Sequence, residues 1–460
     1  MNKNYLTSVS SIVVIVALIA ITAIFPVQFE HYLNIIKQSV IGNFGFIFTY
    51  PAFLAAIFFI GACFTPLGKI KFGSGDPEFK TVSWLGMLFA TGMGIALVTW
   101  GVTEPQMHVA AGMSVNEAML NAYNHWALLA WVGYLAVGVM FSYAIYNMGI
   151  EKPAEELLGN GFLSKLNLVS LVVSTVIGLA LTFSYASTPI QSSLIGWFGV
   201  EINKAVIIGV LALFAIASST SGLNRGIKWL SNYNSVFALI LLFATFVLTQ
   251  PLEILSTLGR LLPEYLVRFP AMATDIGLGD PERKAWLADW LYAFEASWYG
   301  WFIFTGVFIA RISKGRTLRQ MVLGILIAPS LISCLWFTTF GLAGMSENVE
   351  DVFALVAQID STGILSIVLT VNILLFFVTS ADSAGLVCEM LTVNGSRVLW
   401  IVAMAGLAIS INLLSSDIYK VILTLISVAA IPVAFGVFAL GTAFILRVLR
   451  TRKSGIIMAD

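Results

Sequence analysis

Aromatic residues at helical spacing carry the clearest chemical signal in this sequence. Trp126, Trp131 and Tyr134 share one apolar stretch, and Trp298 and Trp301 share another. Trp usually collects at the two faces of a membrane, but several of these residues lie deeper in their stretches. Facing aromatic rings attract a quaternary ammonium group by about 2 kcal/mol when water is excluded. The pattern predicts a cage for a cation that donates no hydrogen bonds.

A second group combines hydroxyl and carboxyl side chains in the apolar stretch from Phe376 to Ser383. Thr379 and Ser380 are adjacent and can offer two oxygens to a hard cation. Such hydroxyls also commonly bond the carbonyl four residues earlier in their own helix. Asp382 is costly at this depth and is a functional candidate for that reason. We favour for it a role in helix packing through hydrogen bonds.

Two glycines, Gly92 and Gly94, flank Met93 inside a third apolar stretch. Small residues of this kind allow close helix packing in membranes. They also allow a helix to unwind, so that its freed carbonyls line a site, as in transporters built from inverted repeats. Both interpretations stay open on this motif alone.

These groups lie in a chain of 460 residues that is 59% hydrophobic and only 10% charged. Soluble domains are about 45–50% apolar and about 25% charged, so the composition excludes an ordinary soluble enzyme. Only helices and closed barrels span a bilayer, and the unbroken apolar runs exclude a barrel. The net charge of +0 gives no sign of nucleic-acid binding. Three cysteines without CxxC spacing and three histidines without HExxH predict no metal cofactor and no disulfide.

The expected fold is all-α, a polytopic membrane protein with twelve transmembrane helices. Most Lys and Arg residues fall on one side when both termini are placed in the cytoplasm. Residues 252–268 mix apolar and charged residues and predict an external interfacial helix broken near Pro263. The twelve apolar runs lie near 8–28, 43–64, 81–101, 120–147, 165–187, 203–220, 231–250, 287–311, 319–345, 363–386, 396–415 and 419–447.

Several motifs in order make the chain resemble the betaine/choline/carnitine transporter family over nearly its whole length. They are Pro77-Glu78-Phe79, Gly92-Met93-Gly94-Ile95, Trp100-Gly101 with Glu104-Pro105, His125-Trp126, the run from Phe308 to Thr317, and Val378-Thr379-Ser380-Ala381-Asp382-Ser383.

The resemblance implies a LeuT-type fold with a 5+5 inverted repeat preceded by two helices. Residues 1–80 would hold these helices and a cytoplasmic loop, 81–250 and 287–447 the two repeats, 251–286 the external helix and loop, and 448–460 a short tail. It also implies a homotrimer. The twelve spans with short ends suit a prokaryotic inner (cell) membrane, where lipid surrounds the protein.

The resemblance also implies the roles of individual residues. Trp126, Trp131, Tyr134 and Trp298 match the aromatic box for trimethylammonium, and Trp301 matches a neighbouring ring. Gly92, Gly94 and Ala96 match the glycine stretch beside the substrate. Arg311, at the cytoplasmic end of the run 287–311, is either a membrane anchor or part of a gating loop. A sodium site would take carbonyls of Ala90, Met93 and Phe376 and hydroxyls of Thr379 and Ser380.

Three positions depart from the family pattern. Glu295 stands where the family usually has tryptophan, so its carboxylate either borders the cage, is protonated, or is paired. Ala96 replaces a glycine common in betaine carriers. In the second sodium site Thr175 and Phe304 match, but Leu179 replaces a threonine, which makes that site weak or absent.

We therefore expect no enzyme but a secondary transporter that imports a small quaternary ammonium compound by alternating access, with Na⁺ as coupling ion and no cofactor. A sodium-independent or proton-coupled exchanger is the alternative, and a non-transporting sensor or an ion channel is more remote. The Gly277-Leu-Gly-Asp280 pattern of membrane aspartyl proteases falls in a polar loop without a Tyr-Asp partner.

Overall fold

The chain is helical throughout the part that the structure describes. A computed structural model describes residues 3–92, 94–159, 161–220, 226–393, 396–412 and 418–453, and these contain no β-strand. An isolated antiparallel bridge joins Lys71 to Thr317. Helices satisfy their own backbone hydrogen bonds, which a lipid environment demands. The prediction of an all-α membrane protein is confirmed at this level.

The helices follow the apolar runs of the sequence. Short π-helical segments interrupt two of them, η1 (Lys37–Ile41) and η3 (Val322–Ile327), and η2 (Pro66–Lys69) is a 3₁₀ turn. The α-helices are α1 (Lys3–Ile24), α2 (Pro26–Ile36), α3 (Gly42–Phe44), α4 (Phe46–Cys63), α5 (Thr81–Gly92), α6 (Ile95–Ala110), α7 (Val115–Trp126), α8 (Leu128–Met148), α9 (Pro153–Glu156), α10 (Phe162–Phe198), α11 (Lys204–Thr220), α12 (Gly226–Leu248), α13 (Pro251–Ala273), α14 (Pro281–Asp289), α15 (Leu291–Ile312), α16 (Leu318–Met321), α17 (Ala328–Glu347), α18 (Val352–Ile359), α19 (Ile364–Leu391), α20 (Arg397–Ile411) and α21 (Ile418–Lys453).

Seven helical segments of the described chain are long and apolar enough to cross a membrane, and eight if the bent pair α12–α13 counts as one span. The protein is therefore a multi-pass membrane protein. The number twelve stays a prediction, because several predicted spans lie on helices that are interrupted, short or less apolar. These are the runs 81–101, 203–220, 231–250, 287–311 and 396–415.

Three of the predicted spans are broken within their length. Gly94 is extended between α5 and α6, with φ −73° and ψ −156°. Ala127 separates α7 from α8, and Trp290 separates α14 from α15. Glycine predicted the first break, whereas the other two have no glycine or proline at the break. At Ala127 the broken turn lets the His125 carbonyl accept the Trp298 indole N–H at 3.2 Å.

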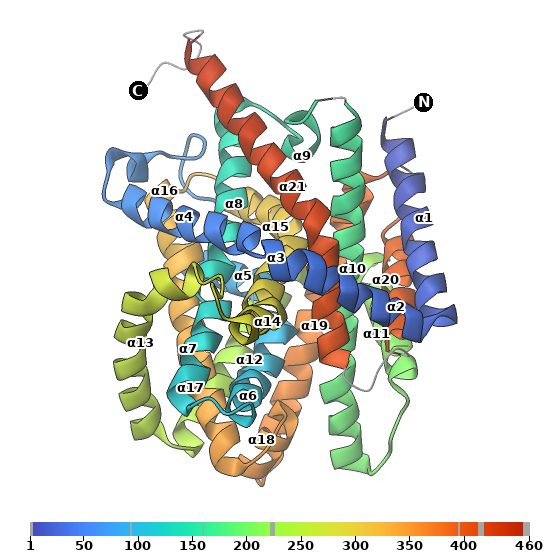
Figure 1. The fold of residues 1–460 in the computed structure, drawn as a ribbon, viewed down its shortest axis with the longest axis vertical. Helices are drawn as coiled ribbons and strands as arrows, with labels where there is room; N and C mark the ends of the chain where they lie inside the picture. Colours follow the sequence, from blue (N-terminus) through green and yellow to red (C-terminus); the bar gives the residue numbers. More distant parts are fainter. Residues whose placement is uncertain are drawn as a thin grey trace.

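The core lies where α15 packs against α8 and α21, and where α10 packs against α19, α20 and α21. Glycines allow the closest approach of α8 and α15. A Cβ on Gly306 would lie 2.4 Å from Val137 Cγ1, and one on Gly138 would lie 2.5 Å from Ile309 Cγ2. Figure 1 shows α21 crossing the bundle diagonally, with the start of α1 and the end of α21 at the same end of the molecule.

Helix α13 corrects one detail of the sequence interpretation. We predicted a helix broken near Pro263, but α13 continues through Pro263 and Pro270 as one helix of 23 residues. It bends by 108° from α12 and buries an apolar face against α7 and α17. The buried face includes Ile254, Leu261, Tyr265 and Phe269. Packing on this face stabilises the helix despite the two prolines.

Candidate functional site

A pocket lies in the middle of the bundle, next to the breaks in α5–α6, α7–α8 and α14–α15. Seven helices contribute to its wall: α6, α7, α8, α10, α15, α19 and α21. None of the described lining residues carries a charged side chain. They are Gly94, Ile95, Ala96, Trp100, Trp126, Tyr134, Leu181, Thr182, Tyr185, Phe294, Ser297, Trp298, Trp301, Ser380, Leu423 and Ile426. The pocket suits a small ligand with an apolar surface.

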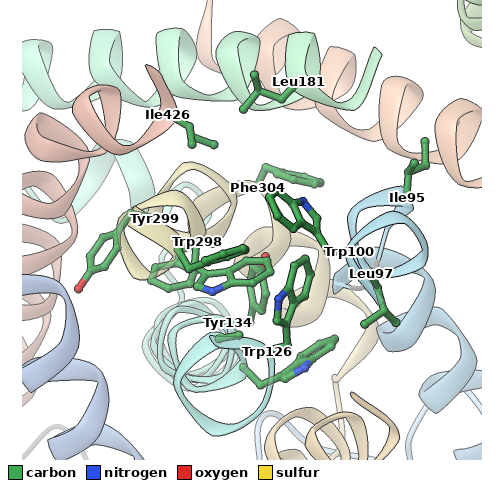
Figure 2. Packing of buried hydrophobic residues seen from close by; sticks show 14 of the residues in the cluster. Ile95, Leu97, Trp100, Trp126, Tyr134, Leu181, Trp298, Tyr299, Phe304 and Ile426 are labelled. Carbon is green, nitrogen blue, oxygen red and sulfur yellow. The ribbon is translucent and has the colours of Figure 1, made fainter. Parts of the chain in front are cut away.

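Aromatic rings of α7, α8 and α15 meet at one side of this pocket. The Trp126 and Trp298 rings are 5.0 Å apart between centroids and perpendicular, at 82°. The Tyr134 ring lies 6.3 Å from that of Trp298. Figure 2 shows these three side chains converging, with Leu181 and Ile426 on the opposite side. Edge-to-face rings expose their electron-rich faces, which is the surface that attracts a cation.

Hydrogen bonds to buried groups hold two of these rings in place. The Trp126 indole N–H donates to Glu104 Oε2 at 2.6 Å. The Trp298 indole N–H donates to the His125 carbonyl at 3.2 Å. An indole nitrogen can only donate, so the ring planes are fixed by acceptors on α6 and α7. Both tryptophans are therefore held in their orientation before any ligand arrives.

Several pocket residues were absent from the sequence-predicted site. Trp100, Tyr185, Phe294 and Ser297 line the pocket. The helical period could have found two of them, since Trp100 lies four residues after Ala96 and Phe294 lies four before Trp298. Tyr185 belongs to the long helix α10, whose orientation the sequence does not reveal.

Three predicted residues do not line the pocket. Trp131 lies behind Tyr134, with ring centroids 5.6 Å apart. Gly92 ends α5 next to the break. Glu295 is fully buried one turn before Trp298, and its carboxyl oxygens have no hydrogen-bond partner among the described residues. An ionised carboxylate there is costly unless a cation comes close.

The predicted sodium ligands fall on α5 and α19, which contact each other. Ala90 lies in the last turn of α5, and Met93 lies outside the described residues. Ser380 lines the pocket. The Thr379 hydroxyl donates to the carbonyls of Leu375 at 2.9 Å and Phe376 at 3.1 Å. Its oxygen lone pairs remain free to accept, so these contacts are compatible with a bound cation.

The other predicted residues are not among those that line the pocket. Thr175 bonds the Leu171 carbonyl at 2.7 Å, and Phe304 is buried with its ring 5.7 Å from Trp301. The Arg311 side chain is exposed. Asp382 lies 3.6 Å from the Arg397 guanidinium in an ion pair between α19 and α20, but its Oδ1 has no hydrogen-bond partner among the described residues, so the role of Asp382 in helix packing stays a prediction.

A carboxyl–imidazole cluster adjoins the pocket and was not predicted. Glu104 and His108 lie one turn apart on α6, and His125 lies on α7. One imidazole nitrogen of each histidine and one carboxyl oxygen of Glu104 lie within 4.8 Å of one another, and all three side chains are fully buried. His125 Nδ1 is 2.6 Å from Glu104 Oε1. The Glu-x-x-x-His spacing in the sequence was the available signal, since it places both on one helix face.

Together, the helical fold, the apolar spans and the internal ring-lined pocket define a multi-pass membrane protein with a central small-molecule site. The chain belongs to BCCT, the betaine/carnitine/choline family of transporters, whose sequence pattern matches residues 6–453. This confirms the resemblance predicted from the motifs, and it indicates transport rather than catalysis.

Relatives in bacteria agree with this family. The chain is 31% identical to the glycine betaine transporter OpuD of Bacillus subtilis, over 83% of this chain and 82% of the relative. It is 30% identical to a glycine betaine transporter of Acinetobacter baylyi, over 89% and 68%. It is 29% identical to a glycine betaine/proline/choline/ectoine transporter of Vibrio parahaemolyticus, over 85% and 76%.

Proposed function

We propose that this protein is a secondary active transporter that imports a small quaternary ammonium compound by alternating access, with Na⁺ as the coupling ion. The substrate would be glycine betaine, choline, carnitine or a close analogue. The perpendicular Trp126–Trp298 pair beside Tyr134 carries this proposal. A trimethylammonium group has no N–H to donate, so neutral rings are suitable partners and a ring of carboxylates is not needed.

The positions of the helix breaks support a LeuT-type arrangement of two inverted five-helix repeats, residues 81–250 and 287–447. The first span of each proposed repeat is broken, at Gly94 and at Trp290. The second spans are also irregular, by the break at Ala127 and by the π-helical segment Val322–Ile327. Broken helices beside a central pocket are typical of carriers built from such repeats.

Sodium coupling is supported by the donors on α19 next to the end of α5. Ser380 faces the pocket, so an ion bound there would lie close to the substrate. An ion that binds one arrangement of the repeats better than the other would bias alternating access. The second ion site is weak because Leu179 offers no oxygen, so one sodium per cycle is the simpler scheme. A sodium-independent or proton-coupled exchanger is the alternative.

We also propose a homotrimer in the cell membrane with both termini cytoplasmic. The outer face of α13 supports a contact with lipid or another copy, because Leu252, Leu255, Leu266 and Val267 on it are exposed. Apolar side chains exposed in this number need a hydrophobic environment.

Uptake into proteoliposomes tests the proposed function. Purified full-length protein is reconstituted, and labelled glycine betaine or choline is supplied with and without an inward sodium gradient. We expect uptake of at least one compound that requires sodium. Ser380→Ala is expected to lower the apparent sodium affinity, whereas Ser256→Ala on the exposed side of α13 serves as its control.

Other outcomes select among the alternatives. If uptake is independent of sodium and is driven instead by preloaded substrate or a pH gradient, the result would support a transporter and contradict sodium coupling. Binding without flux under any gradient would indicate a sensor. No binding and no flux of either compound would reject the substrate class.

A further inference from the structure

The Glu104–His108–His125 cluster has unused capacity for protons. Three ring nitrogens, both of His108 and Nε2 of His125, have no hydrogen-bond partner among the described residues. His108 Nε2 lies 3.5 Å from Glu104 Oε1 without hydrogen-bond geometry. Buried imidazole nitrogens normally have partners. A neutral imidazole carries a proton on one of its two nitrogens, so the other nitrogen of His108 can take up a proton without displacing an existing contact.

The charge of the cluster is balanced from within. Glu104 is fully buried, and a buried carboxylate needs a compensating positive charge. Its other close partner, the Trp126 indole, is neutral. The proton between His125 Nδ1 and Glu104 Oε1, at 2.6 Å, makes a neutral unit of carboxylate and imidazolium. A further proton on His108 would leave the cluster with a net positive charge.

The contact between His125 and Glu104 has the length of a hydrogen bond. The separation of 2.6 Å between His125 Nδ1 and Glu104 Oε1 is normal for a charge-assisted hydrogen bond, in which a carboxylate and an imidazole share one proton. The same three side chains offer nitrogen and oxygen atoms of the kind that zinc accepts as ligands, so metal analysis is one arm of the test.

The cluster contacts the cation cage through several residues. His125 contacts Trp298 and Phe294, and Glu104 is bonded to Trp126. Glu104 Oε2 accepts from Trp126, whose ring is also one wall of the pocket. A positive charge in the cage and a second positive charge on the cluster are therefore separated by a single indole, in surroundings of low dielectric where like charges repel strongly. Protonation of Glu104 itself would also weaken the acceptor that orients the Trp126 ring.

Other titratable groups surround the cluster on the neighbouring helices. Arg283 of α14 lies over the Trp286 ring at 4.3 Å and is paired with Asp275 at 2.8 Å. Further titratable groups on the packed elements include Glu117 and Tyr123 of α7, Tyr134 of α8, Tyr185 of α10, Arg260, Glu264, Tyr265 and Arg268 of α13, Glu282, Lys284 and Asp289 of α14, Tyr292, Glu295 and Tyr299 of α15, Cys334 and Glu347 of α17, Asp351 at the start of α18, and Asp382 of α19.

We infer that Glu104, His108 and His125 form a proton-binding site whose occupancy opposes the binding of a cation in the neighbouring pocket. This inference rests on the proposed function, because it takes a quaternary ammonium group as the pocket's ligand. Linkage is reciprocal. A bound cation therefore releases a proton from the cluster, and a rise in pH strengthens cation binding.

Choline binding measured by calorimetry between pH 5.5 and 8.5 tests the coupling. With one linked proton, the affinity of the full-length protein is expected to rise by up to about tenfold per pH unit within the titration range. Buffers of different ionisation enthalpy report the released proton directly. His108→Gln is expected to flatten the pH profile. His31→Gln, on the exposed side of α2, is the control and is expected to keep it.

A purely structural role for His108 would lower affinity equally at every pH and leave the slope unchanged, which would overturn the inference. The inference would also be overturned if the unaltered protein bound choline with the same affinity at every pH. One equivalent of tightly bound zinc in metal analysis would overturn it as well.

Nitrogen NMR of labelled histidine provides a test that needs no ligand. The chain has only three histidines, so His31→Gln and His108→Gln assign all three signals. We expect the His108 and His125 signals to titrate together and apart from His31, and choline to shift them. The proton site would be rejected if the His108 and His125 signals did not change between pH 5 and 9. If choline fails to bind at any pH, the substrate class fails, while this titration still decides whether the proton site exists.

Discussion

At the scale of single residues, the proposed preference for a cation depends on three aromatic side chains. Trp126, Tyr134 and Trp298 present ring faces and edges without a formal charge, so their attraction for a cation depends on exclusion of water. Trp126 is fixed by Glu104 and Trp298 by the His125 carbonyl. Rings held in this way lose little rotational freedom when a ligand binds, which preserves affinity.

Trp298→Leu tests the cage directly. The substitution keeps an apolar side chain but removes one cation–π partner, worth about 2 kcal/mol when desolvated. We expect the affinity for glycine betaine or choline to fall by about thirtyfold, as measured by equilibrium binding. Trp197→Leu is the matched control, because Trp197 is 39% exposed on α10 and lies outside the pocket. Equal effects of the two variants would contradict the assignment of the cage.

Glu295→Gln tests whether this buried carboxyl selects the ligand's charge. Glu295 has no hydrogen-bond partner in the described structure and lies one turn from Trp298. A nearby ammonium group without its own carboxylate would compensate an ionised Glu295, whereas the carboxylate of glycine betaine would be repelled. We expect the ratio of choline to betaine affinity to fall in the variant, measured by competition binding. Glu282→Gln on exposed α14 is the control, and an unchanged ratio would exclude this role.

The residue types of the cage could be predicted from the sequence, but their orientation could not. Trp126, Tyr134 and Trp298 line the pocket, whereas Trp131 and Glu295 are not among its lining residues. The break at Ala127 changes which face of α8 points inward, and no glycine or proline marks it. Glu104, His108 and His125 were visible as motifs, but their meeting depends on how α6 packs against α7.

At the scale of helices, α8 and α15 pack extensively against each other beside the pocket. Gly133 and Gly138 on α8 and Gly306 on α15 face large side chains of the partner helix. Small residues at such positions let backbones approach in lipid, where packing rather than water exclusion holds helices together. The two helices that carry Tyr134 and Trp298 are held at a fixed separation by these contacts.

Gly306→Ala is expected to disturb this helix pair. The new Cβ would lie 2.4 Å from Val137 Cγ1 and 3.3 Å from a Val137 backbone atom, so the helices must move apart. Overpacking of this kind costs about 1–3 kcal/mol, and we expect a lower unfolding temperature in detergent. Gly209→Ala on α11 has nothing within 4 Å of its Cβ and is expected to be neutral or slightly stabilising. Equal stability of both variants would contradict this packing.

Helix positions followed from apolar periodicity more reliably than helix breaks did. The runs near 165–187 and 363–386 correspond to α10 and α19, although both helices extend further. The break at Gly94 followed from glycine, because glycine adopts conformations that interrupt a helix. The break at Trp290 did not, because it depends on contacts with distant rings such as His108, 4.2 Å away. Tertiary packing also explains why α13 continues through Pro263. The contacts of its buried face outweigh the tendency of proline to break a helix.

At the scale of the whole molecule, two loops far apart in the sequence are joined by hydrogen bonds. Phe72 N–H donates to the Arg316 carbonyl at 2.9 Å, and Gly315 N–H donates to the Phe72 carbonyl at 2.8 Å. The Arg316 guanidinium also donates to the Phe79 carbonyl at 2.6 Å. These contacts bridge the loop after α4 and the loop after α15, and they must break if the two parts separate during transport.

Lys71→Cys combined with Thr317→Cys tests whether this contact opens in the cycle. The two residues form an antiparallel bridge, and Cα atoms in such pairs lie about 4.5–5.5 Å apart, which suits a disulfide. The native cysteines, Cys63, Cys334 and Cys388, are buried. We expect oxidation to block uptake in proteoliposomes and a reductant to restore it, with each single variant unaffected. Full uptake by the oxidised double variant would mean that the loops stay joined throughout the cycle.

The length of α10 has a further consequence for the protein's surroundings. Its 37 residues extend about 55 Å, whereas a bilayer measures about 40–45 Å with its headgroups. Large apolar residues are exposed at both ends, Phe162 at 77% and Phe198 at 68%. Both ends can meet the membrane together only if the helix tilts or the bilayer thickens locally. The acyl-chain length of the lipids is therefore expected to act on this protein much as a ligand does. A bilayer of given thickness favours the conformation in which the tilt of α10 matches that thickness.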